Sequence, residues 1–228
     1  MLAGQAVMVN WSDVAEEDRA TYYAWHGPEH MVGRVSLPGF QRGRRFLAIS
    51  ASRDILVLYE VDDIDVLRGA AYLAKADTPS PLTQHTTKVI RNTARALARV
   101  RMTSGIGLGG FMLTLRLDAD ERHAEALERY LVQEALVRVS GMPGIVGAHL
   151  CIADMEASTI VPVERKGRPT AIPNWIVLIE GISMESVERA CDAELGSETL
   201  CGYGAVLPIE RDTYSHQLLV PKPASPSA

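Results

Sequence analysis

An internal repeat constrains the fold of this chain more than any other feature of its sequence. Residues Asp13 to Phe40 align without a gap on Asp118 to Ile145, so that Pro38-Gly39 falls on Pro143-Gly144. Self-similarity over such a span indicates that one supersecondary unit occurs twice. We therefore expect two halves that are built on the same plan.

Each copy carries the signals of one long helix. Asp13 with Glu16, and Asp118 with Glu121, have the spacing of a capping box, in which the Asp side chain accepts a first-turn N–H and the Glu side chain reaches back to the cap. Apolar residues then recur at helical spacing, and the Pro-Gly pair turns the chain into a strand. The sequence predicts a helix that starts at each Asp and stops at each Pro-Gly pair.

Four strands and a second, shorter helix complete each copy. The predicted strands are 6–11, 40–50, 55–61 and 94–102 in the first copy and 111–117, 145–152, 175–181 and 214–220 in the second. The shorter helices are expected at 65–75 and 184–194. An insertion near Asp154 to Pro173 lengthens a hairpin loop of the second copy, and the tail 221–228 is expected to be flexible.

The order of elements predicts the fold class. Each copy has the order β-α-β-β-α-β, the ferredoxin-like split unit, whose four-stranded sheet has helices on one face and leaves the other face bare. Two such sheets can cover each other, and a tandem repeat supplies both in one chain. We predict an α+β fold with a first repeat at 1–104, which carries the active site, and a degenerate second repeat at 105–220.

One stretch of the chain resembles a known superfamily. Trp25-His26-Gly27-Pro28-Glu29-His30, then Ser36-Leu37-Pro38-Gly39-Phe40 and Arg44-Arg45, resemble the W-H-x-x-E-H, P-G-F, R-R pattern of a bacterial branch of the dimeric α+β barrel proteins. The resemblance covers nearly the whole chain and implies a pseudo-dimeric barrel with a ligand cavity between sheets and helices. Relatives include small cofactor-independent oxygenases, lactone isomerases, decarboxylating and dehydrating enzymes acting on aromatic or polyketide substrates, and haem enzymes. Fold alone selects none of these activities.

Polar residues of the first copy that align with apolar residues of the second are candidates for function. His26 aligns with Leu131 and His30 with Ala135, which indicates that both positions face an interior. Tyr22, His26 and His30 fall four residues apart, on one face of a continuous helix. Two imidazoles about one turn apart can act as base and acid, or orient a substrate hydroxyl.

The strands supply further candidates. Tyr59 aligns with Ile179, and its phenol can donate to a developing oxyanion. Alternation along strand 40–50 sends Arg42 and Arg44 to one face and Arg45 to the other; one face can hold an acidic or phenolate substrate, whereas solvated edge charge would explain at least two of these arginines. The catalytic candidates are His26, His30 and Tyr59, and the candidates for substrate binding are Asn10, Trp11, Tyr22, Trp25 and Arg45.

Two short motifs match the patterns of a zinc site and a dinucleotide site, but neither has the structural context that such a site needs. His26 to His30 spells H-x-x-E-H, the inverted zincin motif, but Gly27-Pro28 disturbs regular helix inside it and no strong third ligand is evident. Gly105 to Gly110 matches G-x-G-x-x-G, yet a strand follows it where a dinucleotide site needs a helix. We therefore predict neither a metal nor a cofactor, and take the glycines as the link between the repeats.

Composition narrows the class of protein further. A formal net charge of −5 lacks the positive excess that nucleic-acid binding normally requires. No apolar run approaches the ~20 residues of a membrane span, and the first ten residues lack the features of a signal peptide. We therefore expect a cytoplasmic protein without nucleic-acid or membrane partners. A homodimer is also expected, because outer sheet edges or helices can pair two chains.

These features lead to one leading functional hypothesis and three alternatives. The leading hypothesis is a cofactor-independent lyase, isomerase or decarboxylase of aromatic catabolism, in which His26 and His30 transfer protons on a small aromatic or aromatic-derived substrate. The alternatives are a cofactor-independent monooxygenase, a non-catalytic small-molecule-binding protein, and a haem protein with one of these histidines as axial ligand.

Overall fold

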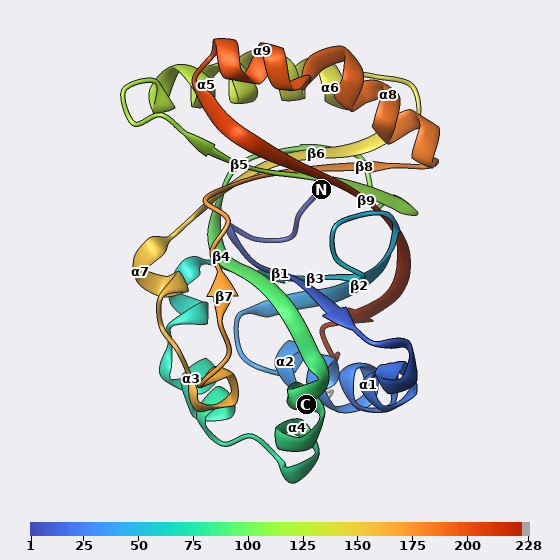
Figure 1. The fold of residues 1–228 in the computed structure, drawn as a ribbon, viewed down its shortest axis with the longest axis vertical. Helices are drawn as coiled ribbons and strands as arrows, with labels where there is room; N and C mark the ends of the chain where they lie inside the picture. Colours follow the sequence, from blue (N-terminus) through green and yellow to red (C-terminus); the bar gives the residue numbers. More distant parts are fainter. Residues whose placement is uncertain (225–228) are drawn as a thin grey trace.

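Two copies of the β-α-β-β-α-β unit build the molecule (Figure 1). The computed structural model describes residues 1–224. The first copy contains β1 (Ala6–Val14), η1 (Glu16–Asp18), α1 (Arg19–Trp25), η2 (His26–Met31), α2 (Val32–Val35), β2 (Phe40–Ser50), β3 (Ile55–Val61), η3 (Ile64–Leu67), α3 (Ala70–Asp77), α4 (Pro81–Thr86), η4 (Thr87–Val89) and β4 (Ile90–Gly105). The second contains β5 (Phe111–Ala119), α5 (Ala124–Tyr130), η5 (Leu131–Ala135), α6 (Leu136–Ser140), β6 (Ile145–Ala153), α7 (Met155–Ser158), η6 (Val163–Arg165), β7 (Thr170–Ala171), β8 (Trp175–Gly181), α8 (Met184–Glu194), α9 (Ser197–Gly202) and β9 (Ala205–Pro221).

The strands close into one barrel within the single chain. Their order is β1-β3-β2-β9-β5-β8-β6-β4, and β4 pairs back onto β1. The long strands β4 and β9 make the closure, because each pairs first inside its own repeat and then with the neighbouring repeat. This arrangement confirms the predicted α+β fold. No second copy of the chain is needed to complete the barrel, and the homodimer stays a prediction.

Side chains are buried in three layers. Inward-facing residues of both repeats fill the barrel, among them Trp11, Phe46, Leu58 and Ile176. Helices cover the outer face of each half, so they lie at opposite ends of the view in Figure 1. Strand alternation therefore places successive residues in different layers, one inside the barrel and the next under the helices.

The helix starts differ from the capping-box prediction. Asp13 lies in β1 and Asp118 in β5, and the helices begin later, at Glu16 and Ala124. The Asp13 carboxylate instead accepts the backbone N–H of Asp54 at 3.0 Å. Both capping boxes are therefore wrong, because pairing with the adjacent strands β4 and β9 extends β1 and β5 through the residues that local spacing assigned to helix caps.

The Pro-Gly turns follow the prediction. Gly39 and Gly144 both have a positive φ, 83° and 86°, a conformation that favours glycine. A Cβ atom on Gly39 would also lie 2.4 Å from Cγ2 of Val66. Each turn therefore ends its helix where the sequence predicts.

The segment between the repeats links β4 to β5, as expected. Gly109 donates its backbone N–H to the Glu180 carboxylate at 3.0 Å, so this link is packed against the barrel. At the other end, Pro221 still belongs to β9 and the Lys222 N–H donates to Gln41. The predicted tail 221–228 therefore starts later than expected, and its residues 225–228 lie outside the described part. Within residues 1–224, no helix is both long enough and apolar enough to cross a membrane.

Candidate functional site

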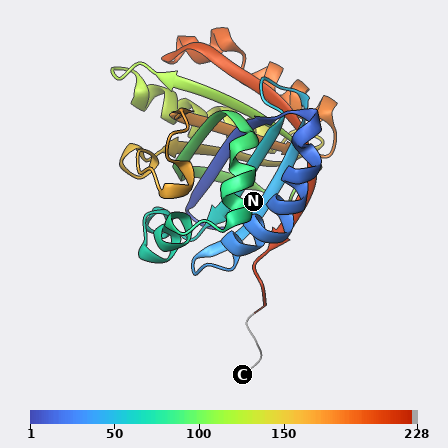
Figure 2. The same cartoon turned by 60° about the horizontal axis from the view of Figure 1, so that its bottom comes forward.

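A cavity lies in the first repeat between the outer face of its sheet and the helices that cover it. Its volume is about 80 Å³, several times the roughly 10–15 Å³ that one water molecule needs. Figure 2 shows the helices that cross this face, α1 in blue and α4 in green. The floor comes from β1, β3 and β4, and the wall from α1, η2 and α2.

Most of the predicted site residues line this cavity. They are His26, His30, Tyr59, Asn10, Tyr22 and Trp25. Trp11 does not, because alternation along β1 turns it into the barrel, where the Arg116 guanidinium lies 4.8 Å from its ring centroid. The predicted contact of Trp11 with substrate therefore has no support in its position.

Arg45 stands behind His26 and does not line the cavity. Its Nη1 lies 3.1 Å from Nδ1 of His26, and its Nε donates to Gln217 at 2.6 Å. Alternation along β2 does separate Arg45 from Arg44, as predicted. Both side chains are buried, however, so the expectation that at least two of the three β2 arginines carry solvated charge is wrong.

The contact with Arg45 determines which nitrogen of His26 carries the proton. A guanidinium only donates hydrogen bonds, so Nδ1 of His26 must accept and the neutral ring carries its hydrogen on Nε2. Burial, and secondly the charge of Arg45, holds the pKa of His26 well below its usual range. His26 is therefore a neutral imidazole that can donate a hydrogen bond from Nε2.

His30 is the second imidazole of the cavity. Its ring centroid lies 5.6 Å from that of His26 and 4.6 Å from that of Trp25. Burial, and then the charge of Arg34, lowers its pKa well below the usual range. Among residues 1–224, His30 makes no hydrogen bond through its ring nitrogens. It is therefore a neutral imidazole with a free lone pair, as a general base requires.

A π-helical turn brings the two imidazoles together. Residues His26–Met31 form η2, and Pro28 fits in this turn without breaking the helix that runs from α1 into α2. The equivalent segment Leu131–Ala135 is also π-helical although it has no proline. The turn therefore occurs in both repeats. The disturbance of regular helix that the sequence predicts at Gly27-Pro28 does not separate the two imidazole rings.

Glu29 points away from the imidazoles. Its carboxylate accepts hydrogen bonds from the hydroxyls of Ser80 and Thr83, and Thr83 accepts the indole N–H of Trp25 at 2.9 Å. These contacts join α4 to the helix of the histidines.

Within residues 1–224 no group of three His, Cys, Asp or Glu side chains is placed to hold a metal ion. The glutamate of the H-x-x-E-H motif, Glu29, instead holds α4 against the helix of the histidines.

Two buried polar groups of the cavity have no partner in the described chain. They are the Tyr59 hydroxyl and Nη1 of Arg34. Tyr59 is 1% exposed and Arg34 2% exposed, and burial raises the pKa of Tyr59 so that its hydroxyl stays protonated. Buried polar groups are nearly always hydrogen-bonded. Both donors are therefore free to bond to an acceptor that enters the cavity.

The insertion of the second repeat completes the cavity of the first. Glu164, Arg165 and Arg168 line it, and Glu164 forms an ion pair with Arg34. The insertion lies beside α3 in both cartoon views, where the Asp77 carboxylate accepts the Val163 N–H at 2.9 Å. Sequence reasoning missed these residues. The available signal was that only one repeat carries the insertion.

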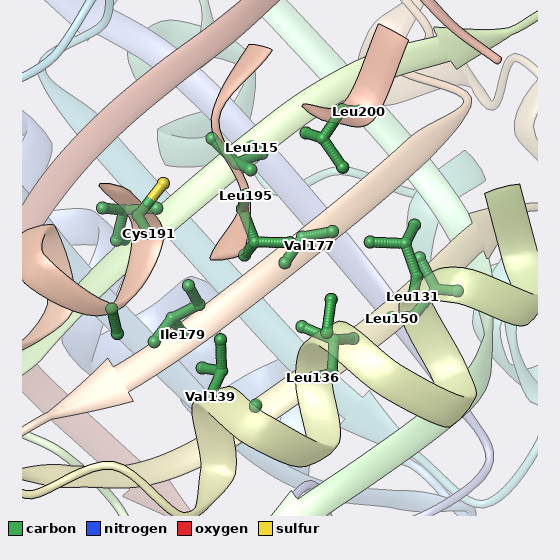
Figure 3. Packing of buried hydrophobic residues seen from close by; sticks show 14 of the residues in the cluster. Leu115, Leu131, Leu136, Val139, Leu150, Val177, Ile179, Cys191, Leu195 and Leu200 are labelled. Carbon is green, nitrogen blue, oxygen red and sulfur yellow. The ribbon is translucent and has the colours of Figure 1, made fainter. Parts of the chain in front are cut away.

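In the second repeat, over the residues 111–221 that the structure describes, apolar side chains occupy the space equivalent to the cavity (Figure 3). Leu131 and Ala135 stand where the first repeat has its histidines, and Ile179 stands where it has Tyr59. All three are buried in one cluster with Val177 and Leu150. The asymmetry between the aligned copies thus corresponds to a cavity in one half and a packed core in the other.

Comparison with known proteins shows the fold and nothing finer. No protein-family model matches the chain, and no curated protein matches it. An anthrone oxidase-like protein superposes with a TM-score of 0.67 at 12% identity, over 96% of this chain and 94% of that one. A candidate monooxygenase from Fusobacterium nucleatum superposes with a TM-score of 0.62 at 10% identity, over 97% and 96%.

A third solved structure agrees with these two. It is a candidate monooxygenase from Lactobacillus acidophilus, with a TM-score of 0.57 at 12% identity, over 96% of this chain and 97% of that one. The fold is the ferredoxin-like, dimeric α+β barrel fold. Coverage of nearly the full length in all three pairs means that both repeats, and their closure into a barrel, are shared.

The cavity does not fit a haem. The His26 ring is stacked on Tyr22, with the ring centroids 4.7 Å apart and the planes at 15°, and the cavity that both imidazoles line has a volume of about 80 Å³, which is too small for a macrocycle. A larger cleft of about 830 Å³ adjoins the cavity, but no His, Cys, Met or Tyr side chain lines it. An axial ligand and the space for a porphyrin are therefore in different places.

The lowered pKa values of His26 and His30 predict a specific loss of stability in acid. Unfolded histidine takes up a proton as the pH falls below about 6.5, whereas His26 and His30 remain neutral in the folded protein because their pKa values are lowered. Each such histidine then lowers the free energy of unfolding by about 1.4 kcal/mol per pH unit. Urea unfolding across this range checks the slope. His26→Gln should flatten it, and exposed His85→Gln should leave it unchanged.

Proposed function

We propose that this protein is a cofactor-independent enzyme that transfers a proton on a small aromatic substrate, as an isomerase or lyase does. One observation carries the proposal: a neutral imidazole with a free lone pair, His30, lines the same cavity as two donors, Nε2 of His26 and the hydroxyl of Tyr59. A base next to donors that face the same space is the arrangement that proton abstraction beside a carbonyl requires.

The reaction step follows from these three groups. His30 takes a proton from a carbon next to a carbonyl, and the electron pair of that C–H bond moves onto the carbonyl oxygen. Nε2–H of His26 and the Tyr59 hydroxyl donate to the oxyanion that forms. Return of the proton from His30 to a different carbon completes an isomerisation, and loss of a leaving group from the neighbouring carbon completes a lyase reaction.

The aromatic character of the substrate rests on the walls of the cavity. Tyr22, Trp25 and Tyr72 line it together with Met8 and Val57. Flat aromatic faces and apolar side chains favour a flat apolar ring, which gains both burial and offset stacking. A small polar metabolite without a ring would leave these faces uncovered.

Deuterium exchange tests the proposal without knowledge of the natural substrate. Phenylpyruvate has an aromatic ring and an acidic methylene group next to a ketone. In D₂O, the protein should accelerate replacement of the methylene hydrogens well above the buffer rate, as followed by proton NMR. Exchange at the buffer rate, with this probe and with other aromatic ketones of its size, would contradict the proposed proton transfer.

The similar solved structures favour a second candidate, a cofactor-independent monooxygenase. The TM-scores of 0.67 and 0.62 belong to an anthrone oxidase-like protein and a candidate monooxygenase. The first step would be the same, but the carbanion would react with dioxygen. A CH₂ group then becomes C=O, and the second oxygen atom leaves as water with the two hydrogens. Oxygen uptake with anthrone that depends on His30 would favour this candidate, whereas exchange without uptake favours the first.

A further inference from the structure

Three arginines at the cavity have no carboxylate partner among residues 1–224. Arg95 is 3% exposed and its Nη2 donates to the Tyr72 hydroxyl at 2.9 Å. Arg165 donates to the Thr170 hydroxyl at 2.8 Å, and Arg168 donates to backbone carbonyls. All three line the cavity, Arg95 from β4 and the other two from the insertion. Their hydrogen bonds therefore go to neutral groups only.

Several unpaired cations lie close together at this cavity, Arg95 buried and Arg165 and Arg168 partly buried. A charge that is withdrawn from water is normally paired, since its desolvation is unfavourable. The one acidic residue that lines the cavity, Glu164, already forms an ion pair with Arg34. Burial, and then the charges of Arg95 and Arg168, lowers the pKa of Arg165 to about 9. The cavity thus has an excess of positive charge in a protein whose net charge is negative.

Arg168 lies where the cavity meets the larger open cleft. Thr87, Ile90, Glu164 and Arg168 line both spaces, so a small molecule can enter the cavity on this side. The imidazoles and Tyr59 line the cavity but not the cleft. A molecule that spans the cavity would therefore place its anionic group near the entrance and its reactive carbon near His30.

We propose that Arg95, Arg165 and Arg168 form a carboxylate-binding site, so that the ligand of the cavity is an aromatic carboxylate. The site joins the two repeats, since Arg95 belongs to the first and the other two arginines to the insertion of the second. A planar guanidinium matches the two oxygens of a carboxylate, and such charge-assisted hydrogen bonds are strong in a desolvated site. The inference deepens the proposed function, on which it rests for the aromatic ring, by naming the substrate class.

Calorimetric binding of a matched ligand pair tests the site. Phenylacetate and phenylacetamide have nearly the same shape but differ in charge. Phenylacetate should bind at least ten-fold more tightly, because only the carboxylate compensates the guanidinium charges. Equal affinity of the two ligands would overturn the proposal. Inorganic phosphate is the third ligand: if it binds and phenylacetate does not, the site takes phosphate and the carboxylate assignment is wrong.

Substitution of one arginine locates the effect. Arg165→Gln should weaken phenylacetate binding by roughly ten-fold or more, Arg165→Lys should weaken it less, and the exposed Arg122→Gln should leave it unchanged. A melting curve for each variant establishes that it is folded. Unchanged binding by folded Arg165→Gln would contradict the site. Binding requires no proton transfer, so phenylacetate binding without deuterium exchange would end the catalytic proposal and leave this one standing.

Discussion

His30→Gln is expected to lower the deuterium-exchange rate on phenylpyruvate by roughly 100-fold or more, since a positioned general base contributes about 10²–10⁴ in rate. Glutamine has a similar size, but its amide has no basic lone pair. The side chain packs beside Trp25 and His26 without a hydrogen bond of its own in the described chain, so the substitution should leave the fold intact. The NMR assay described for the wild-type protein measures the effect.

Two companion variants separate chemistry from packing. His26→Gln can still accept from Arg45 and donate to a ligand, so its loss should be smaller than that of His30→Gln. His85→Gln changes an exposed histidine of α4 and should exchange at the wild-type rate. If His30→Gln and His85→Gln exchanged equally fast, His30 would not be the base.

Arg44→Ala is expected to destabilise the protein by about 3–5 kcal/mol, the usual result of removing one partner from a buried ion pair. Arg44 is fully buried inside the barrel, where its Nη1 lies 2.6 Å from Oε2 of Glu180 and its Nη2 lies 3.1 Å from Oε1 of Glu60. Glu60 and Glu180 are equivalent residues of the two repeats. The substitution would leave both carboxylates with less compensation in the centre of the molecule.

The electrostatics of Glu180 support this expectation. Burial alone would raise its pKa, but the contact with His149 at 3.4 Å and the charge and hydrogen bonds of Arg44 hold that pKa below the usual range. Urea unfolding at neutral pH measures the loss. Arg101→Ala is the matched control, because the Arg101 side chain is 48% exposed in its ion pair with Glu128 and such pairs contribute about 0–1 kcal/mol. Similar losses in both variants would show that the central network does not stabilise the barrel.

The sequence alone predicted the architecture because its signals are local or repeated. Strand alternation and the Pro-Gly turns depend on neighbouring residues, and the duplication is visible by aligning the chain with itself. Together they led to the β-α-β-β-α-β order of both halves, whereas α4, α7, β7 and α9 were not predicted. The comparison of aligned positions also pointed to His26, His30 and Tyr59, which line one cavity. Where a polar residue of the first repeat aligns with an apolar residue of the second, the first repeat has a cavity and the second has a packed apolar core.

Helix-cap spacing gave the wrong prediction where pairing with a strand distant in sequence competes with it. Asp13 has the spacing of a helix cap, but β1 continues through it to pair with β4, and the carboxylate bonds to Asp54 instead. Trp11 and Arg45 were assigned to substrate binding by residue type. Trp11 lies inside the barrel and Arg45 contacts His26 without lining the cavity, and both positions depend on which face of each strand meets the helices.

By itself, the sequence determined that two copies of one unit occur and that only the first has histidines at the helix positions that align with Leu131 and Ala135. Only the tertiary structure decided that the insertion of the second copy brings Arg165 and Arg168 to that cavity, and that Arg45 places the proton of His26 on Nε2. The reason is physical. Secondary structure follows from groups a few residues apart, whereas charge balance in a cavity follows from side chains that meet only after the barrel has closed.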